Sequence, residues 1–324
     1  MPNSGNLAAD IRRTAFFLVG PTATGKTAVG HILAEKLSLP ILSADSMMVY
    51  RGMNIGTAKP TPEEISKFDY AGLDLTDPDR DFSVADYLRS LAARPEKQWI
   101  AAGGTGLYVR CLTEGLREIP AASAAIRARA EEILAAGGIE ALQAELKTIA
   151  PEKFAALADP KNPRRLIRAI EAASSQTSKD WKRPGPETSN DWKSRSESQP
   201  VLAGLRMEKA ALEKRIRARV EKMYADDLIE EARSLREKFT QLSKTSLQAI
   251  GYAEAFAVLD GKISERDAKE LTVIRTRQLA KKQMTWFRRQ HCVEWIDVTE
   301  NDSPEKTADA VQLIWKKYVA EPGA

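Results

Sequence analysis

Apolar and amphipathic segments alternate along the N-terminal part of the chain. The stretch "TAFFLV" (14–19) is almost continuously apolar, as in a buried strand, and residues 26–37 carry apolar side chains at helical spacing. "LPILSAD" (39–45) and "KQWIAAGGTG" (97–106) predict two more strands, the first ending in a carboxylate and the second entering a glycine turn. This alternation predicts an α/β fold with a parallel sheet, in which ligands bind at the carboxyl ends of the strands.

The pattern changes after Pro120. The chain there becomes rich in Ala, Glu and Leu and predicts short helices, one of which begins with Asn162 as its N-cap and Pro163 in its first turn. Residues 174–199 are polar, rich in Ser and Pro, and without periodicity, which predicts a mobile linker. The region 121–199 therefore interrupts the alternation of strands and helices.

The earlier pattern returns after this interruption. "VLAGLRM" (201–207) predicts a strand by which the sheet resumes, and residues 208–290 predict long charged helices. We therefore expect an α/β core formed by residues 1–120 and 200–324, with residues 121–199 as a mostly helical insertion.

Composition narrows the class of protein only slightly. The chain has 324 residues, 43% hydrophobic and 29% charged, which is typical of globular proteins. Its two cysteines, Cys111 and Cys292, are too few for a disulfide framework, so we expect a reducing, cytoplasmic setting. The N-terminal "MPNSGNLAADIRR" lacks the apolar core of a secretory signal, and no apolar run approaches the ~20 residues that span a bilayer.

Positive charge is concentrated in one segment. The net charge is only +4, but residues 272–290 contain no acid and six cations: Arg275, Arg277, Lys281, Lys282, Arg288 and Arg289. Such a segment is a candidate contact surface for a polyanion. Trp286 and Phe287 are interleaved with the cations, which suits base stacking in a nucleic acid. The alternative is an amphipathic helix that packs Met284, Trp286 and Phe287 inward, and the two interpretations are compatible.

"GPTATGKT" follows the first predicted strand and fits the pattern G-x-x-x-x-G-K-[ST] of a phosphate-binding loop. It consists of Gly20, Pro21, Thr22, Ala23, Thr24, Gly25, Lys26 and Thr27. The glycines let the backbone wrap around phosphate oxygens, and the N–H groups and the helix N-terminus supply positive potential. Lys26 adds a point charge, and Thr27 can hold Mg²⁺. The sequence therefore predicts phosphate binding and leaves open which phosphate ester is bound.

Three further features combine residues that could do chemistry. Asp45, at the end of a predicted strand, is either a general base or a helix N-cap or Mg²⁺-water ligand. The glycine turn 103–106 could let a bulky ligand approach the backbone beside the Thr105 hydroxyl, and a plain turn is the simpler alternative. Arg215 and Arg219 lie four residues apart, on one helix face, and could clamp a diphosphate unless they are solvated surface arginines.

Several motifs together resemble one known family. "SADSMMVYRGMNIGTAKPT", "GGTGLYV", "RRLIRAIE", "LQAIGYAE" and "TRQLAKKQMTWFR" follow the loop in the order found in bacterial tRNA dimethylallyltransferases, also called tRNA isopentenyltransferases. The resemblance covers roughly residues 14–297, and generic phosphate-loop kinases lack the "DSMMVYRGMNIGTAKP" segment. It implies a P-loop NTPase-like core and Mg²⁺-dependent transfer of a dimethylallyl group from its diphosphate. The acceptor would be the exocyclic N6 amine of the adenine 3′ of the tRNA anticodon (position 37), and diphosphate would be released.

The resemblance also implies roles for residues of this chain. Asp45 becomes the general base, while Lys26, Mg²⁺ at Thr27, and Arg215 or Arg219 stabilise the departing diphosphate. The adenine would leave its stack to enter the site, and the helical insertion would grip the anticodon arm. The tRNA-contacting positions implied are Asp45, Ser46, Met47, Met48, Thr105, Arg127, Arg164, Arg165, Leu166, Ile167, Arg168, Gln248, Ala249, Ile250, Gly251, Tyr252, Ala253, Lys281, Lys282, Gln283, Met284, Thr285, Trp286, Phe287 and Arg288.

Two alternative functions remain at this point. A small-molecule kinase using ATP would explain the loop but not the basic segment or the insertion. The second is a nucleotide-dependent switch or an RNA-binding protein without catalytic activity. Against a GTPase switch, no Asn-Lys-x-Asp guanine-binding motif occurs in the chain. His31 and His291 lack metal-ligand spacing, so we predict no zinc site. We expect a cytoplasmic monomer without a membrane partner.

Overall fold

The chain divides into two units, which we call the core unit (residues 1–116 and 196–324) and the helical unit (117–195). The structure is a computed structural model, and it describes residues 15–92, 94, 98–115, 124–174, 200–289 and 293–319.

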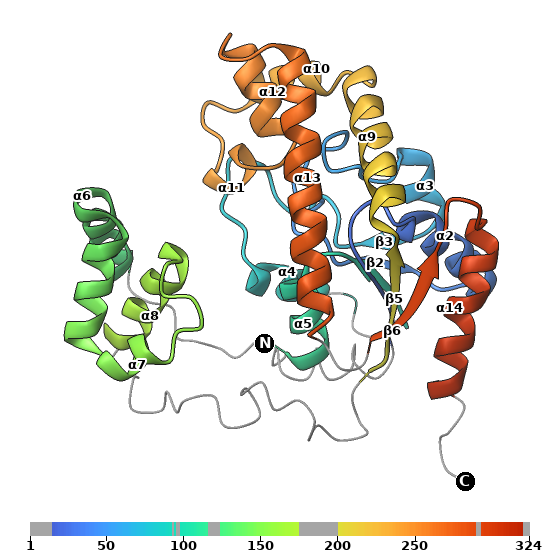
Figure 1. Cartoon of the computed structure of the whole chain (residues 1–324), viewed down its shortest axis with the longest axis horizontal. Helices are drawn as coiled ribbons and strands as arrows, with labels where there is room; N and C mark the ends of the chain where they lie inside the picture. Colours follow the sequence, from blue (N-terminus) through green and yellow to red (C-terminus); the bar gives the residue numbers. More distant parts are fainter. Residues whose placement is uncertain are drawn as a thin grey trace. The chain divides into compact units, whose positions relative to one another are not determined.

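A parallel sheet organises the core unit. Its strands are β1 (Phe16–Val19), β2 (Ile41–Ser43), β3 (Tyr70–Ala71), β4 (Ile100–Gly103), β5 (Leu202–Met207) and β6 (Val293–Val298), in the order β3-β2-β4-β1-β5-β6 (Figure 1). All neighbouring strands are parallel. In register, Val19 lies opposite Gly103 and Ser43 opposite Ala102, so β1, β2 and β4 end at one edge. The predicted parallel α/β fold is confirmed, and the sheet does resume after residue 200.

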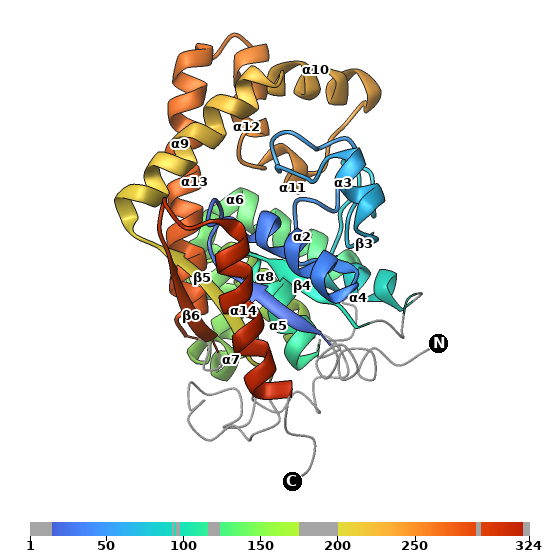
Figure 2. The same ribbon diagram turned by 90° about the vertical axis from the view of Figure 1, so that its right-hand side faces the viewer.

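Strand side chains alternate between two apolar layers, because successive residues of a strand face opposite sides of a sheet. The helices involved are α2 (Lys26–Leu37), α4 (Val84–Leu91), α5 (Gly106–Glu114) and α14 (Pro304–Val319). Leu18 packs in the layer that contains Leu33 of α2 and Trp315 of α14, whereas Phe17 packs in the opposite layer with Tyr108 of α5. Figure 2 shows α2 and α14 side by side over their face of the sheet.

A group of helices extends beyond the carboxyl edge of the sheet (Figure 1). They are α9 (Lys209–Ala225), α10 (Leu228–Lys238), α11 (Lys244–Leu247), α12 (Tyr252–Leu259) and α13 (Glu265–Phe287). The short helix α3 (Pro62–Lys67) lies beside α2 instead, where Lys67 pairs with Glu35 at 3.2 Å. The two long helices, α9 and α13, pack against each other, and the Tyr224 and Thr272 hydroxyls lie 3.0 Å apart between them. Ser264 caps α13 by accepting the Asp267 N–H at 3.1 Å.

The helical unit has an apolar core of its own. It contains α6 (Ala124–Ile149), α7 (Pro151–Ala155) and α8 (Pro163–Ser174). Gly138, with φ 67°, breaks α6 into two shorter helices. Leu142 of α6 and Leu166 of α8 are fully buried within this core. The predicted start of α8 is confirmed, because Asn162 Oδ1 accepts the Arg164 N–H at 3.1 Å and Pro163 opens the helix.

Some predictions fall on undescribed residues. Residues 175–199 of the predicted linker lie outside the described ranges, as do His291 and Cys292, whereas Ser174 ends α8. Cys111 is a buried free thiol in α5. Of the helices that the structure describes, none is both long and apolar enough to cross a membrane.

Candidate active site

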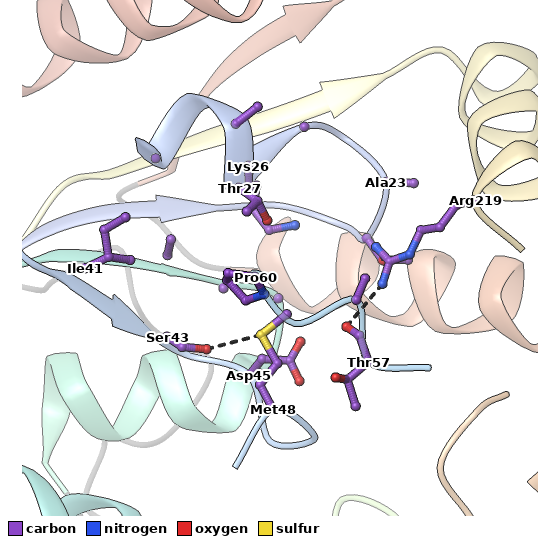
Figure 3. A pocket seen from close by; sticks show the side chains of 18 of the residues that line it. Ala23, Lys26, Thr27, Ile41, Ser43, Asp45, Met48, Thr57, Pro60 and Arg219 are labelled. Atoms are coloured by element: carbon purple, nitrogen blue, oxygen red, sulfur yellow. Dashed lines mark hydrogen bonds between the residues drawn. The ribbon is translucent and has the colours of Figure 1, made fainter. Parts of the chain in front are cut away.

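A cavity of about 430 Å³ opens at the carboxyl edge of the sheet. The segment after β1, the segment after β2, the turn after β4 and the helix α9 all contribute to its wall. Figure 3 shows Asp45 across the cavity from Lys26 and Thr27, with Arg219 entering from a third side. The cavity thus brings together residues up to 261 positions apart in the sequence, from Thr22 to Gln283 of α13, at the edge where a doubly wound fold binds ligands.

The backbone of the phosphate-binding loop turns through left-handed conformations at Ala23 and at Gly25. Ala23 has φ 66° and Gly25 has φ 93°. The Thr24 hydroxyl donates to the Pro21 carbonyl at 2.9 Å, which closes the loop on itself. Helix α2 begins directly after Gly25, so its N-terminus and the loop N–H groups face the same cavity.

Lys26 is held inside this loop. Its Nζ donates to the Pro21 carbonyl at 2.7 Å. Burial and the neighbouring Arg219 guanidinium lower the pKa of Lys26 to about 7, and the Asp45 carboxylate opposes this shift. The charged form of Lys26 is therefore much less favoured near neutral pH than that of an ordinary lysine. An anion that entered the cavity would favour the charged form.

The two arginines of α9 both reach the cavity but differ in depth. Arg219 donates to the Thr22 hydroxyl at 2.9 Å and to the Thr57 carbonyl at 3.3 Å (Figure 3). Burial lowers the pKa of Arg219, and the Asp45 carboxylate opposes that shift. Arg215 lies nearer the rim, where it donates to the Thr299 carbonyl at 3.5 Å. The alternative of solvated surface arginines is therefore wrong for Arg219.

Asp45 and Thr105 belong to two loops that are fastened together. Asp45 Oδ1 accepts the Met47 N–H at 2.9 Å, and Thr105 Oγ1 accepts the Ser46 N–H at 3.1 Å. The Thr105 N–H also donates to the Ala44 carbonyl at 3.3 Å. No helix starts directly after Asp45 among the described residues, so the N-cap interpretation is wrong. Asp45 instead forms a short side-chain turn with the Met47 N–H and lines the cavity.

The glycine turn after β4 is crowded by the protein itself. A Cβ at Gly104 would meet the side-chain amide of Gln283, and one at Gly106 would meet the ring of Trp286. The backbone of this turn is therefore closely approached, as expected, but by side chains of α13 and not by a bulky ligand. Gln283 Oε1 also accepts the Thr22 N–H of the phosphate loop at 2.9 Å.

A buried lysine and a partly buried glutamate that the sequence did not reveal support the segment 45–60. The Lys59 ammonium donates to the Tyr50 carbonyl at 2.8 Å and to Asp74 at 2.7 Å. The Glu231 carboxylate of α10 accepts the backbone N–H groups of Asn54 and Ile55 at 3.0–3.2 Å. It also accepts the hydroxyl of Tyr252 from α12. Side chains of α10 and α12 thus help to hold the segment that follows Asp45 in place.

The residues that the resemblance assigned to tRNA differ in exposure. The exposed ones are Arg127, Arg164, Arg165, Arg168, Gln248, Lys281, Lys282, Thr285 and Arg288, and the partly exposed ones are Asp45, Ser46, Met47, Met48, Thr105, Ile250, Ala253, Met284 and Trp286. The side chains of Leu166, Ile167, Ala249, Tyr252, Gln283 and Phe287 are buried, as is Gly251. Direct contact with tRNA through these buried side chains does not fit the structure, because they form the packed side of the same helices and turns.

One buried carboxylate joins two of the exposed arginines in the helical unit. Glu171 of α8 lies 2.8 Å from Arg168 of the same helix and 3.5 Å from Arg127 of α6. Its side chain is 3% exposed, whereas those of the two arginines are 48% and 63% exposed. Glu171 therefore aligns cations from two helices toward solvent.

The parallel sheet, the glycine loop before α2 and the cationic cavity define a phosphate-loop α/β protein. A family model described as "IPP transferase" matches residues 48–290, and one described as "Isopentenyl transferase" matches residues 13–74. The chain belongs to the IPP transferase family.

Individual relatives agree with this assignment. The chain is 39% identical over 313 residues to a tRNA dimethylallyltransferase of Geobacillus thermodenitrificans, covering 94% of this chain and 95% of the relative. It is 37% identical to one of Streptomyces avermitilis, covering 94% and 96%. Among solved structures, a tRNA isopentenylpyrophosphate transferase of Bacillus halodurans matches with a TM-score of 0.64 and 35% identity, covering 95% and 97%. A eukaryotic dimethylallyltransferase, solved acting on tRNA, shares the fold with a TM-score of 0.72 at 19% identity, covering 95% and 80%.

Proposed function

We propose that this chain transfers a dimethylallyl group from dimethylallyl diphosphate to the N6 amine of the adenine 3′-adjacent to the anticodon (position 37) in tRNA. The observation that carries the proposal is that one cavity combines a phosphate loop with a carboxylate, Asp45, on its opposite wall. Family membership and the names of the relatives support the same activity and favour it over an ATP-dependent kinase.

The donor diphosphate would occupy the loop side of the cavity. The loop N–H groups and the N-terminus of α2 supply hydrogen-bond donors there, and Lys26 and Arg219 supply charge. When the bond between the allylic carbon and the diphosphate oxygen breaks, its electron pair leaves with the diphosphate. Lys26 and Arg219 then stabilise the charge that develops on the leaving group.

Mg²⁺ fits the donor set on this side of the cavity. The Thr27 hydroxyl is exposed there and makes no hydrogen bond with the described residues, and hard oxygen ligands are those that Mg²⁺ prefers. The described residues contain no cluster of three His, Cys, Asp or Glu side chains that could hold a metal alone. Thr27 would therefore share the ion with diphosphate oxygens and water. A bound Mg²⁺ would neutralise part of the diphosphate charge.

The acceptor adenine would enter from the side of Asp45. Its N6 amine is a weak nucleophile, because its lone pair is delocalised into the purine. As the new bond forms between N6 and the allylic carbon, one N6 proton passes to Asp45. Thr105 and the backbone around Ser46 are fastened together beside Asp45 and would limit where the base can lie.

The tRNA backbone would be held by exposed cations on both units. In the core unit these are Lys281 and Lys282 of α13 and Arg288 directly after it, and in the helical unit they are Arg127, Arg164, Arg165 and Arg168. Contacts of this kind position an RNA without reading its sequence. Selection of one adenine would then depend on the flipped base in the cavity. The insertion would in this way act as the part that grips the anticodon arm.

The test of this proposal is Asp45→Asn, which keeps an oxygen for the Met47 N–H but cannot accept the proton. Loss of a general base should slow single-turnover transfer of a labelled dimethylallyl group to tRNA by ~10²–10⁴-fold. Donor affinity, measured by calorimetry with Mg²⁺, should stay close to that of the unchanged protein. Transfer within tenfold of the unchanged protein would contradict the role of Asp45.

A further inference from the structure

Gln283 occupies an unusual position on α13. It lies in the most basic segment of the chain, between the exposed Lys282 and the partly exposed Met284, yet it is only 8% exposed itself. Lys281 and Lys282 precede it on the solvent side of the helix. The side chain of Gln283 points the other way and lines the cavity. Sequence position alone therefore groups it with the tRNA-contacting residues, whereas the structure places it at the phosphate loop.

The orientation of its amide group is fixed by the loop. The Thr22 N–H can only donate, so the atom of Gln283 that lies 2.9 Å from it must be the acceptor Oε1. The nitrogen Nε2 then faces the glycine turn, close to Gly104, where a Cβ would collide with it. Nε2 makes no hydrogen bond to any residue that the structure describes. A donor in a largely buried side chain at a cavity wall is suited to a ligand oxygen.

Gln283 also shares its contact with the deeper of the two arginines. Arg219 of α9 donates to the Thr22 hydroxyl at 2.9 Å, while Gln283 of α13 accepts the Thr22 N–H. Two helices therefore hold Thr22 of the phosphate loop: α9 contacts its hydroxyl, and α13 contacts its backbone N–H. Gln283, Arg219 and Lys26 all line the same cavity.

We propose that Gln283 is a donor-binding residue, whose Nε2 donates a hydrogen bond to an oxygen of the bound diphosphate while its Oε1 holds the Thr22 peptide. The ligand class is a diphosphate ester, and the inference rests on the proposed function only for the identity of the allylic group. Gln283 accordingly belongs to the diphosphate site and not to the tRNA surface of α13.

The variant Gln283→Glu separates this role from a purely structural one. A glutamate keeps an oxygen for the Thr22 N–H, so a side chain that only held the loop would be replaced with little loss. It lacks the donor and adds a negative charge that would face the diphosphate. Gln278→Glu is a matched control, because Gln278 is exposed on the same helix and receives the same charge.

The measurement is calorimetric binding of inorganic diphosphate with Mg²⁺, which requires no transfer activity. We expect Gln283→Glu to weaken binding by about ten- to a hundredfold, as for loss of a hydrogen bond to a charged group. Gln283→Ala should weaken it less, and Gln278→Glu should leave it unchanged. Melting temperatures identify which variants fold, and if Gln283→Glu does not fold, unchanged diphosphate binding by Gln283→Ala would overturn the assignment.

Two results would overturn the assignment of Gln283. One is diphosphate binding by the folded Gln283→Glu variant within twofold of the unchanged protein. The other is an equal loss in Gln283→Glu and Gln278→Glu. Failure of the proposed function would give a different set of results. The unchanged protein would bind diphosphate and the Gln283→Glu variant would bind it more weakly, but the unchanged protein would transfer no dimethylallyl group to tRNA.

Discussion

Lys26 is the residue whose charge depends most directly on what the cavity contains. Its pKa of about 7 in the ligand-free protein results from burial and from the Arg219 guanidinium. A diphosphate beside it would favour the charged form and raise that pKa. At pH 8 most Lys26 side chains are neutral before binding and become charged on binding, whereas at pH 6 they are already charged. Donor binding should therefore take up protons at pH 8 and weaken as the pH rises above 7.

Calorimetry in buffers of different ionisation enthalpy measures this proton uptake. Lys26→Arg is the control, because a guanidinium keeps its charge throughout this range. We expect proton uptake at pH 8 to be larger in the unchanged protein than in the variant, by up to about one proton, and the difference to vanish at pH 6. Equal uptake by both proteins at pH 8 would mean that Lys26 does not change its charge when the donor binds.

At the scale of elements, the helical unit depends on a carboxylate between two helices. Glu171→Ala removes the partner of Arg168 and of Arg127, which belong to α8 and α6. Because the carboxylate is buried, its loss should lower the free energy of unfolding of this unit by about 1–3 kcal/mol. It should also weaken tRNA binding through misaligned arginines. Hydrogen exchange of the α8 amides and tRNA binding measure the two effects.

Glu145→Ala is the matched control for this prediction. Glu145 lies 3.5 Å from Arg129 in the same unit, but its carboxylate is 27% exposed, against 3% for Glu171, and the arginine is 74% exposed. Exposed ion pairs contribute little, so the variant should change unfolding by less than about 1 kcal/mol. Equal exchange of the α8 amides in both variants would show that the buried Glu171 is no more important than the partly exposed Glu145.

The exposed face of α13 gives a second prediction at this scale. Replacing Lys281 and Lys282 with Ala should weaken tRNA binding and flatten its dependence on salt, because each lost phosphate contact lowers the slope by something under about one unit. Donor affinity should not change, since both side chains point away from the cavity. Arg266→Ala, at the opposite end of α13 with a side chain 90% exposed, is the control. Unchanged slope and affinity in the double variant would identify these lysines as an ordinary solvated face.

At the scale of the whole molecule, the parts predictable from sequence are those encoded locally. The phosphate loop is predicted from a contiguous motif, and the bounds 26–37 of the following helix, α2, from the spacing of its apolar residues. The structure reproduces both. Asn162 and Pro163 mark a helix start for the same reason. In contrast, β6 and α14 escaped prediction, because the alternation in "VEWIDV" is interrupted by acids and β6 is only partly buried.

The contacts that shape the site could not be predicted, because they join distant parts of the chain. Gln283 meets Thr22 across 261 positions, and Glu231 meets Asn54 across 177. A polar residue on the buried side of a basic helix has the same appearance in a sequence as one on its exposed side. Only the packing of α13 against the glycine turn, where Gly104 and Gly106 leave room, distinguishes the two.

The most direct test of the whole account is to follow the dimethylallyl group itself. The protein would be incubated with Mg²⁺, tRNA and dimethylallyl diphosphate labelled at the allylic carbon, and the tRNA digested and analysed by mass spectrometry. We predict label on N6 of the adenine 3′ of the anticodon, with one diphosphate released for each group transferred. A tRNA with guanine at that position should remain unlabelled, and ATP should not be required. Absence of label from tRNA, together with ATP-dependent phosphorylation of a small molecule, would contradict the account.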